Sequence, residues 1–214
     1  MLTDAQANAV AAVANTTGKA VDASRGIGGF LTDTVGSIPS DLLGIAGGDW
    51  LHEQRRRNLG RMRAKTERIL ESIDRSRITE PSASIVVPLL QAAADEKREA
   101  LQDLWAALLA NSMVDGGEKV RRAFFAVVGR MEPLDARLLD MISRHEGEEH
   151  SFNSPEIEAE IIDAGLALLE VKISLQCLRQ LDLTSGGLHF RSDMKSRLGL
   201  SVFGHGLMRA CKVV

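Results

Sequence analysis

The amino-acid sequence predicts a mainly α-helical protein, with a multi-helix N-terminal bundle followed by a winged helix-turn-helix-like C-terminal domain that carries a small two-stranded β wing. Two observations support this prediction. Apolar residues recur at i, i+3, i+4 and i+7 along most of the chain, which is the spacing of one helix face. Near the C-terminus this spacing gives way to short segments around Gly186 and Gly187, which are typical of a hairpin.

Composition divides the chain into three predicted segments, 1–49, 50–131 and 132–214. Its 214 residues, 44% of them hydrophobic, are enough to bury a core. A formal net charge of −3 gives no overall attraction to nucleic acid or anionic lipid, so either contact would need a local patch. Cys177 and Cys211 have no Cys-x-x-Cys partner and indicate reduced thiols. Without a signal peptide or a long apolar run, the protein is expected to be cytoplasmic.

The first segment contains two kinds of sequence. Residues 3–24 are rich in alanine and predict a loosely packed helix. Residues 25–49 alternate glycine with apolar residues, and two interpretations stay open: short helices that pack closely, or a membrane-active segment. Asp33 and Asp41 disfavour full insertion into a bilayer. The candidate contacts with a membrane or a partner are Ile27, Phe30, Leu31, Leu42 and Leu43.

A long helix is predicted to begin at Trp50, with Asp49 as its N-cap, and to end near Arg77. Residues 50–77 contain nine basic and four acidic residues. We interpret the basic side chains as a solvated or salt-bridged face. The alternative is a surface for anions, nucleic acid or a membrane. The candidate residues for that surface are Arg56, Arg57 and Arg61, and the apolar face of the helix carries Leu59, Met62, Ile69 and Ile73.

The centre of the bundle is predicted over 88–113. Residues 79–88 contain two prolines and predict a non-helical connector, and residues 88–113 predict the core helix. Asn111 is interpreted as a C-terminal cap, with a polar group at an interface as the alternative. A further helix is predicted over 118–131. The inward residues are Leu101, Leu104, Trp105, Leu108 and Leu109 in the core helix and Val120, Phe124, Val127 and Val128 in the next.

After residue 132 the sequence predicts three helices and a hairpin. Pro133 begins the first helix, Ser154 and Pro155 begin the second, and residues 164–181 form the third. Residues 183–190 and 198–203 form the hairpin and lead into a last helix. This order of elements suggests a winged helix-turn-helix. The inward residues are Leu134, Leu138, Leu139, Met141 and Ile142 in the first helix and Leu168, Val171, Leu175 and Leu178 in the third.

The third of these helices would be the recognition helix if the domain bound DNA. Its charged residues, Glu170, Lys172 and Arg179, leave it neutral overall once Asp182 is included. DNA-contacting helices usually present Arg, Lys, Asn or Gln to the groove. Protein contact is therefore at least as well supported as DNA binding. The candidate phosphate contacts in the wing are Arg191, Lys195 and Arg197.

No motif indicates catalysis, a cofactor or a small-molecule substrate. The run Thr16-Thr17-Gly18-Lys19 lacks the earlier glycine and the following Ser or Thr of a phosphate loop. His145 and His150 are five residues apart, which is not the four-residue spacing of two zinc ligands on a helix. A Gly-x-Ser-x-Gly elbow is also absent from the sequence. We therefore expect a non-enzymatic protein without a bound metal.

Several runs together point to a family. The most specific is Leu104-Trp105-Ala106-x-Leu108-Leu109-Ala110-Asn111. It is accompanied by Gly48-Asp49-Trp50-Leu51, Val87-Pro88-Leu89-Leu90-Gln91, Met131-Glu132-Pro133-Leu134-Asp135 and Leu200-Ser201-x-Phe203-Gly204. Over about residues 25–214 the chain resembles the bacterial Abi-alpha family, a domain of otherwise unknown function named for abortive infection. The resemblance implies antiphage defence, in which an infected bacterium stops growing or dies before progeny emerge. It implies no catalytic residue.

The leading hypothesis is an abortive-infection defence protein without enzymatic activity. It is expected to act through a protein partner, through self-association, or through peripheral contact with the inner face of the membrane. Two alternatives remain open. One is a winged-helix DNA-binding transcriptional regulator, and the other is an oligomeric scaffold with no activity of its own.

Overall fold

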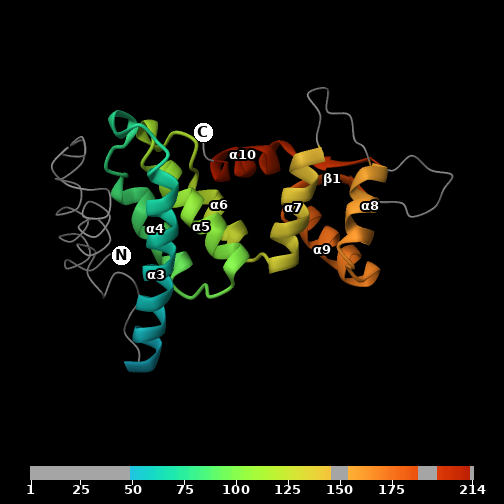
Figure 1. Ribbon diagram of the computed structural model, residues 1–214, viewed down its shortest axis with the longest axis horizontal. Helices are drawn as coiled ribbons and strands as arrows, with labels where there is room; N and C mark the ends of the chain where they lie inside the picture. The colour runs from blue at the N-terminus through green and yellow to red at the C-terminus, as the bar shows by residue number, and fades with distance from the viewer. Residues whose placement is uncertain (1–48, 146–153, 188–196, 213–214) are drawn as a thin grey trace, which may run out of the picture. The chain divides into compact units, whose positions relative to one another are not determined.

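The computed structural model describes residues 49–145, 154–187 and 197–212. The chain divides into two compact units, one comprising the described residues of Met1–Gly129 and Ala210–Val214 and the other those of Arg130–Arg209. Helices dominate the described residues, and two short antiparallel strands lie near the C-terminus (Figure 1). The prediction of a mainly α protein with a small two-stranded sheet is therefore confirmed.

The first unit is built around one helix. It contains α3 (Asp49–Leu70), α4 (Ala83–Ala93), α5 (Glu99–Ser112) and α6 (Arg122–Val128), with short 3-10 turns at η2 (Arg75–Arg77) and η3 (Asp115–Gly117). Helix α5 contacts each of the other three helices, and ten of its fourteen residues are buried. The predicted core helix is confirmed over this range. The N-terminal end of α3 projects beyond the other helices of the unit (Figure 1).

The predicted helix over 88–113 is wrong at its beginning, because two helices occupy this stretch. Residues 94–98 form a bend, in which Arg98 has an extended backbone (φ −79°, ψ 125°) and serves as the N-cap of α5. The buried carboxylate of Glu96 accepts hydrogen bonds from the Arg98 backbone N–H and from its guanidinium, each 2.9 Å long. The Gln102 amide donates to the Glu96 carbonyl at 2.8 Å. These local side-chain hydrogen bonds compensate for the backbone bonds lost where the helix is interrupted.

The predicted connector over 79–88 is also wrong, since α4 begins at Ala83 and contains Pro88. Proline inside a helix removes one backbone hydrogen bond and costs about 3 kcal/mol. Helix α4 tolerates this because Val86, Leu89 and Leu90 are almost fully buried in the unit. Burial of each such side chain contributes about 1.5–3 kcal/mol, which outweighs the cost of the proline.

The predicted helix from Trp50 to Arg77 ends early, at Leu70. Leu59 and Met62 are buried as predicted, and Ile69 is partly buried. After Leu70 the chain turns, so that Ile78 pairs with Val114 in an antiparallel bridge and the Thr79 N–H donates to the Met113 carbonyl at 2.7 Å. Packing against the end of α5, and not the local sequence, decides where α3 ends.

A further difference concerns α6, which is shorter than the predicted helix over 118–131. Helix α6 spans Arg122–Val128, and Val120 is buried outside it. Phe124 and Val128 lie in the core as predicted, and Val127 is half-buried. The buried ring of Phe125 tilts against Trp105, with the ring centroids 6.2 Å apart.

Asn111 was predicted to cap the core helix, but it lies inside α5, whose C-cap is Met113. Its buried amide nitrogen donates to the Ala107 carbonyl at 3.1 Å and to the Ala210 carbonyl at 2.9 Å. The second bond joins residues 99 positions apart, within the first unit. Asn111 therefore ties the end of the chain to the central helix, which no local sequence pattern could indicate.

The second unit contains α7 (Pro133–His145), α8 (Ser154–Asp163), α9 (Leu168–Gln180), β1 (Thr184–Gly187), β2 (Arg197–Leu200) and α10 (Val202–Cys211) up to Arg209. Strands β1 and β2 pair antiparallel, with Thr184 opposite Leu200 and Gly187 opposite Arg197. Helix α7 contacts α8, α9 and β2. Its predicted inward residues Leu138, Leu139, Met141 and Ile142 are buried.

Asp135 joins the start of α7 to α9. The Glu132 N–H donates to one carboxylate oxygen of Asp135 at 2.8 Å, as in the return half of a capping box. The Ser174 hydroxyl donates to the other oxygen, and both side chains are buried. The run Glu132-Pro133-Leu134-Asp135 therefore specifies both the beginning of α7 and its contact with α9.

A Schellman motif ends α8. Gly165 has a φ of +64°, its N–H donates to the Ile162 carbonyl at 2.9 Å, and the Leu166 N–H donates to the Ile161 carbonyl at 3.2 Å. The predicted helix over 164–181 therefore begins only at Leu168. Leu168, which was predicted to face inward, is exposed, whereas Val171 and Leu178 are buried as predicted.

The pH dependence of the first unit can be checked at Glu96. Burial disfavours its charged form, but the hydrogen bonds from Arg98 outweigh this and lower the pKa of Glu96 below 4.5. Because the pKa of Glu96 is lower in the folded protein, its ionised carboxylate stabilises the fold. This contribution is complete above about pH 4.5 and is lost as the pH falls through the pKa of Glu96 in the folded protein. At pH 7, Glu96→Gln should therefore lower the free energy of unfolding by about 1–2 kcal/mol.

Urea denaturation at pH 7 and at pH 3 measures this effect. The difference between wild type and Glu96→Gln should shrink at pH 3, and Glu118→Gln, at an exposed carboxylate, serves as the control. If wild type and Glu96→Gln differed equally in their free energy of unfolding at pH 7 and at pH 3, a lowered pKa of Glu96 would be contradicted.

Candidate interaction surfaces

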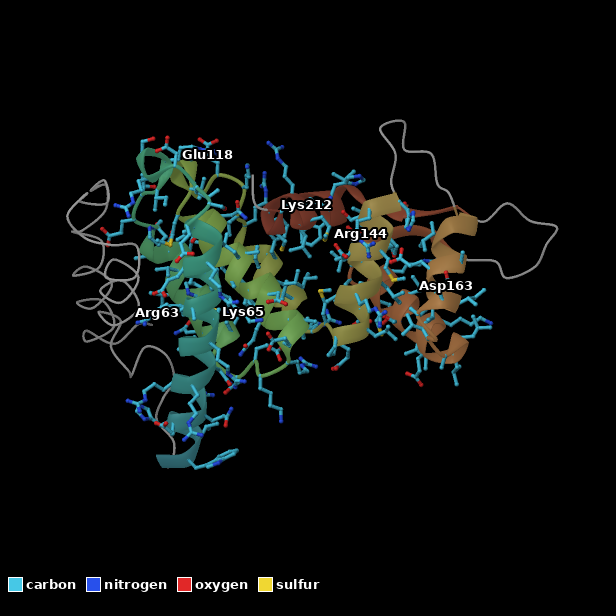
Figure 2. All side chains as sticks on the ribbon, viewed as in Figure 1. Arg63, Lys65, Glu118, Arg144, Asp163 and Lys212 are labelled. Carbon is cyan, nitrogen blue, oxygen red and sulfur yellow. The ribbon has the colours of Figure 1, made fainter. Side chains whose placement is uncertain are left out.

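The basic face of α3 is for the most part paired. Arg55 holds Asp95 through two bonds of 2.7 and 2.8 Å, and these bonds lower the pKa of Asp95. Lys65, labelled in Figure 2, donates to Glu99 and Asp103 on α5. Within α3, Arg56 and Arg57 pair with Glu53, and Arg63 pairs with Glu67. The interpretation as a salt-bridged face is thus correct for these side chains.

One face of α3 nevertheless presents arginines to solvent. Arg57, Arg61 and Arg68, which we call the basic stripe, are exposed and lie at i, i+4 and i+11, so they share one side of the helix. The Arg61 guanidinium donates to the Asn58 side chain at 2.9 Å, and the Arg68 guanidinium donates to the Ala64 carbonyl at 3.3 Å. These bonds orient the arginines without removing them from solvent.

The first turns of α3 add an apolar group to this face. The Trp50 side chain is 77% exposed, and Leu51 beside it is also exposed. Trp50 precedes Arg57 by seven residues and Arg61 by eleven, so it lies in line with the basic stripe. We call Trp50, Leu51, Arg56 and Arg57 the α3 tip. The sequence predicted Trp50 as the beginning of a helix and as part of a family motif, but not as part of a surface.

The second unit exposes four large apolar side chains on the two sides of the α8–α9 turn. Ile162 is 74% exposed and Leu169 is 66% exposed, and Leu168 and Ile173 are exposed as well. We call these four residues the apolar patch. Leu169 and Ile173 are four residues apart on α9 and therefore lie one above the other. Large apolar side chains gathered on a surface mark contact sites more often than isolated ones do.

Sequence reasoning missed the apolar patch because it took 164–181 as one helix with Leu168 inward. Burial of Val171, Ser174 and Leu178 leaves Leu169 and Ile173 on the opposite face, and Leu168 is exposed as the first residue of α9. Gly165 was the signal in the sequence that could have located the end of α8 and the later start of α9.

Several predicted site residues lie outside the described residues. These are Ile27, Phe30, Leu31, Leu42, Leu43, Arg191 and Lys195. Arg197 begins β2, and Arg56, Arg57 and Arg61 lie on α3. The structure does not bring Arg197 together with the α3 arginines in one unit.

The region around His145 forms ion pairs. His145 and Arg144 at the end of α7 contact the two carboxylate oxygens of Glu160 on α8, at 2.7 and 3.0 Å (Figure 2 labels Arg144). The hydrogen bond with His145 is the main cause that lowers the pKa of Glu160. The described residues include no cluster of His, Cys, Asp and Glu that could hold a metal. His150 lies outside them.

Both cysteines are free, as predicted. Burial raises the pKa of the Cys211 thiol to about 12, so this thiol stays protonated at neutral pH. Within the part of the chain that the structure describes, no helix has the length and apolar character needed to cross a bilayer.

Comparison with known proteins gives one result. No curated protein and no solved structure matches the chain. The model of one family, described as abortive infection alpha, matches residues 54–211, which include all of the described helices from α4 to α10 and most of α3. The chain therefore belongs to the abortive infection alpha family, as its tryptophan-containing core helix had indicated.

Proposed function

We propose that this protein acts in abortive infection without enzymatic activity, by binding another protein through the apolar patch of its second unit. The family supplies the biological setting. The observation that carries the proposed mode of action is the exposure of Ile162, Leu168, Leu169 and Ile173 around a single turn. Removing each such side chain from water contributes about 1.5–3 kcal/mol to an association.

The chemistry of α9 favours a protein partner over DNA. Three helices followed by two strands, α7, α8, α9, β1 and β2, support the winged helix-turn-helix that the sequence suggested, in which α9 would be the recognition helix. Its first two turns expose Leu168, Leu169 and Ile173, with Glu170 and Lys172 among them. Apart from Lys172, these apolar and acidic side chains lack the donors that bind phosphates and most base edges. A protein surface with its own apolar residues fits this face better.

A second candidate is contact with a membrane surface. The observation in its favour is the exposed Trp50 in line with the basic stripe, because tryptophan and arginine are the residues that hold helices at anionic lipid. The glycine-spaced apolar residues of 25–49 immediately precede this helix in the sequence. In this case the N-terminal region, and not the apolar patch, would act when infection is sensed.

Phage infection of bacteria that express the chain tests the proposal. The double variant Leu169→Asp with Ile173→Asp should lower the affinity for the partner protein by about 100-fold or more and abolish protection against phage. Val202→Asp is the matched control, since Val202 is a 93% exposed apolar residue at the start of α10. Circular dichroism of each purified variant establishes that it is folded.

The same assay separates the two candidates. The triple variant Ile27→Asp, Phe30→Asp and Leu31→Asp should leave protection intact if the apolar patch is the acting surface. Protection that survives the patch substitutions and is lost with the triple variant would refute the proposal in favour of the membrane. Sedimentation with vesicles containing anionic lipid then measures that contact directly.

A further inference from the structure

The apolar patch and the α3 tip have complementary chemistry, although they belong to different units. Both present exposed apolar side chains, Trp50 and Leu51 on one and Ile162, Leu168, Leu169 and Ile173 on the other. We propose that the apolar patch binds the α3 tip of a second copy of this chain. The inference rests on the proposed function, because it names the partner of the same surface.

Charge supports this occupant. Helix α3 contains seven basic and three acidic residues, whereas α8 contains four acidic residues and no basic one. Asp163, labelled in Figure 2, ends α8, and Glu170 lies in the first turn of α9; both are exposed at the border of the apolar patch. In the sequence Lys172, exposed between Leu169 and Ile173, is the one Lys or Arg from 145 to 178, and the same stretch contains eight Asp and Glu residues. Opposite charges at the border steer two surfaces together and set their orientation.

The α3 tip has the shape and the residues of a segment that could dock onto the apolar patch of another copy. It lies at the end of α3, which projects beyond the other described helices of the first unit (Figure 1). Glu53 accepts hydrogen bonds from Arg56 at 3.1 Å and from Arg57 at 3.0 Å, so one carboxylate holds two exposed guanidinium groups beside Trp50. Tryptophan and arginine are the residues that contribute most at protein interfaces. An aromatic anchor with two cations is the counterpart of an apolar surface with an acidic border.

The contact is heterologous, because one copy contributes the α3 tip and the other contributes the apolar patch. Each copy keeps one unused tip or patch after binding, so association continues beyond a dimer unless a ring closes. This property distinguishes the contact from a symmetric dimer in which two patches meet. It also determines how the contact can be tested.

Mixing two defective variants is the decisive experiment. The patch variant is Leu169→Asp with Ile173→Asp, and the tip variant is Trp50→Asp with Arg57→Glu. Light scattering after size-exclusion chromatography should show wild type assembling beyond its 23.2 kDa with rising concentration. Each variant alone should associate about 30-fold more weakly and remain a monomer. An equimolar mixture should form a complex of twice the monomer mass and no larger, because only one competent tip–patch pair remains.

Rescue in the mixture also establishes that both variants are folded. Raising the salt concentration should weaken the complex, since the charged border is exposed. A wild type that stays monomeric at all concentrations would overturn the inference, and so would a mixture that stays monomeric. A tip variant that dimerises by itself would also overturn it, because a symmetric contact between two patches predicts that result. Variants that each assemble like wild type would overturn it as well.

The result is independent of the phage assay. A monomeric wild type whose patch variant still loses protection would refute the second copy as partner and leave the proposed function standing. Assembly that follows the tip and the patch, together with full protection by the patch variant, would establish the contact and refute the proposed function.

Discussion

Replacing Trp105 with alanine is expected to lower the free energy of unfolding of the first unit by about 3–5 kcal/mol, the largest loss of any single substitution considered. Trp105 is fully buried in α5 and packs against Phe125. Truncation removes the largest side chain of the core and leaves a cavity that the surrounding α3, α4 and α6 close only in part. Since native domains are stable by about 5–15 kcal/mol, the variant should be close to unfolding.

Urea denaturation followed by circular dichroism measures this loss. Trp50→Ala is the matched control, because the chain has two tryptophans and Trp50 is exposed. That substitution should change stability by at most about 0.5 kcal/mol. Trp105→Phe should cost less than alanine, since the indole nitrogen of Trp105 has no hydrogen-bond partner among the described residues. A cost of less than about 1 kcal/mol for Trp105→Ala would contradict the buried position.

Replacing Gly204 with alanine is expected to destabilise the second unit by about 3 kcal/mol. A Cβ atom at this position would lie 2.0 Å from the Leu183 carbonyl oxygen, which is backbone and cannot rotate away. The first turn of α10 is held at this distance by Ser201, whose N–H donates to that carbonyl at 3.0 Å and whose hydroxyl accepts from the Gly204 N–H at 2.9 Å. The methyl group would therefore push α10 away from the strand region.

Gly60→Ala is the control for the same chemical change. Gly60 lies inside α3 with no atom within 4 Å of an added Cβ, so alanine should stabilise the helix by about 0.5–1 kcal/mol. Thermal unfolding of both variants should therefore shift in opposite directions. A Gly204→Ala protein with an unchanged midpoint of thermal unfolding would show that Gly204 of α10 does not pack against the Leu183 carbonyl.

The two surfaces that carry the proposals differ in how much the sequence revealed of them. The basic residues of α3 were visible from composition, and the pairing of Arg55 with Asp95 and of Lys65 with Glu99 and Asp103 was anticipated only as a general tendency of such faces. The partners lie 34 to 40 residues further along the chain, beyond the range of any local pattern. The inward face of α9 was predicted correctly at Val171 and Leu178, which leaves Leu169 and Ile173 outside it, and Leu168, the first residue of α9, was wrongly placed inward.

The sequence by itself determined the helical class and the family, and it placed the central helix over residues 99–112, the start of α7 at Pro133 and the hairpin near the C-terminus. It could do so because helix periodicity, capping residues and glycine turns act over a few neighbouring residues. Only the tertiary structure decided that α4 runs through Pro88, that the chain bends at residues 94–98, and that Leu169 and Ile173 face solvent. These features depend on the free energy of burial against elements far away in the chain, which local propensity cannot report.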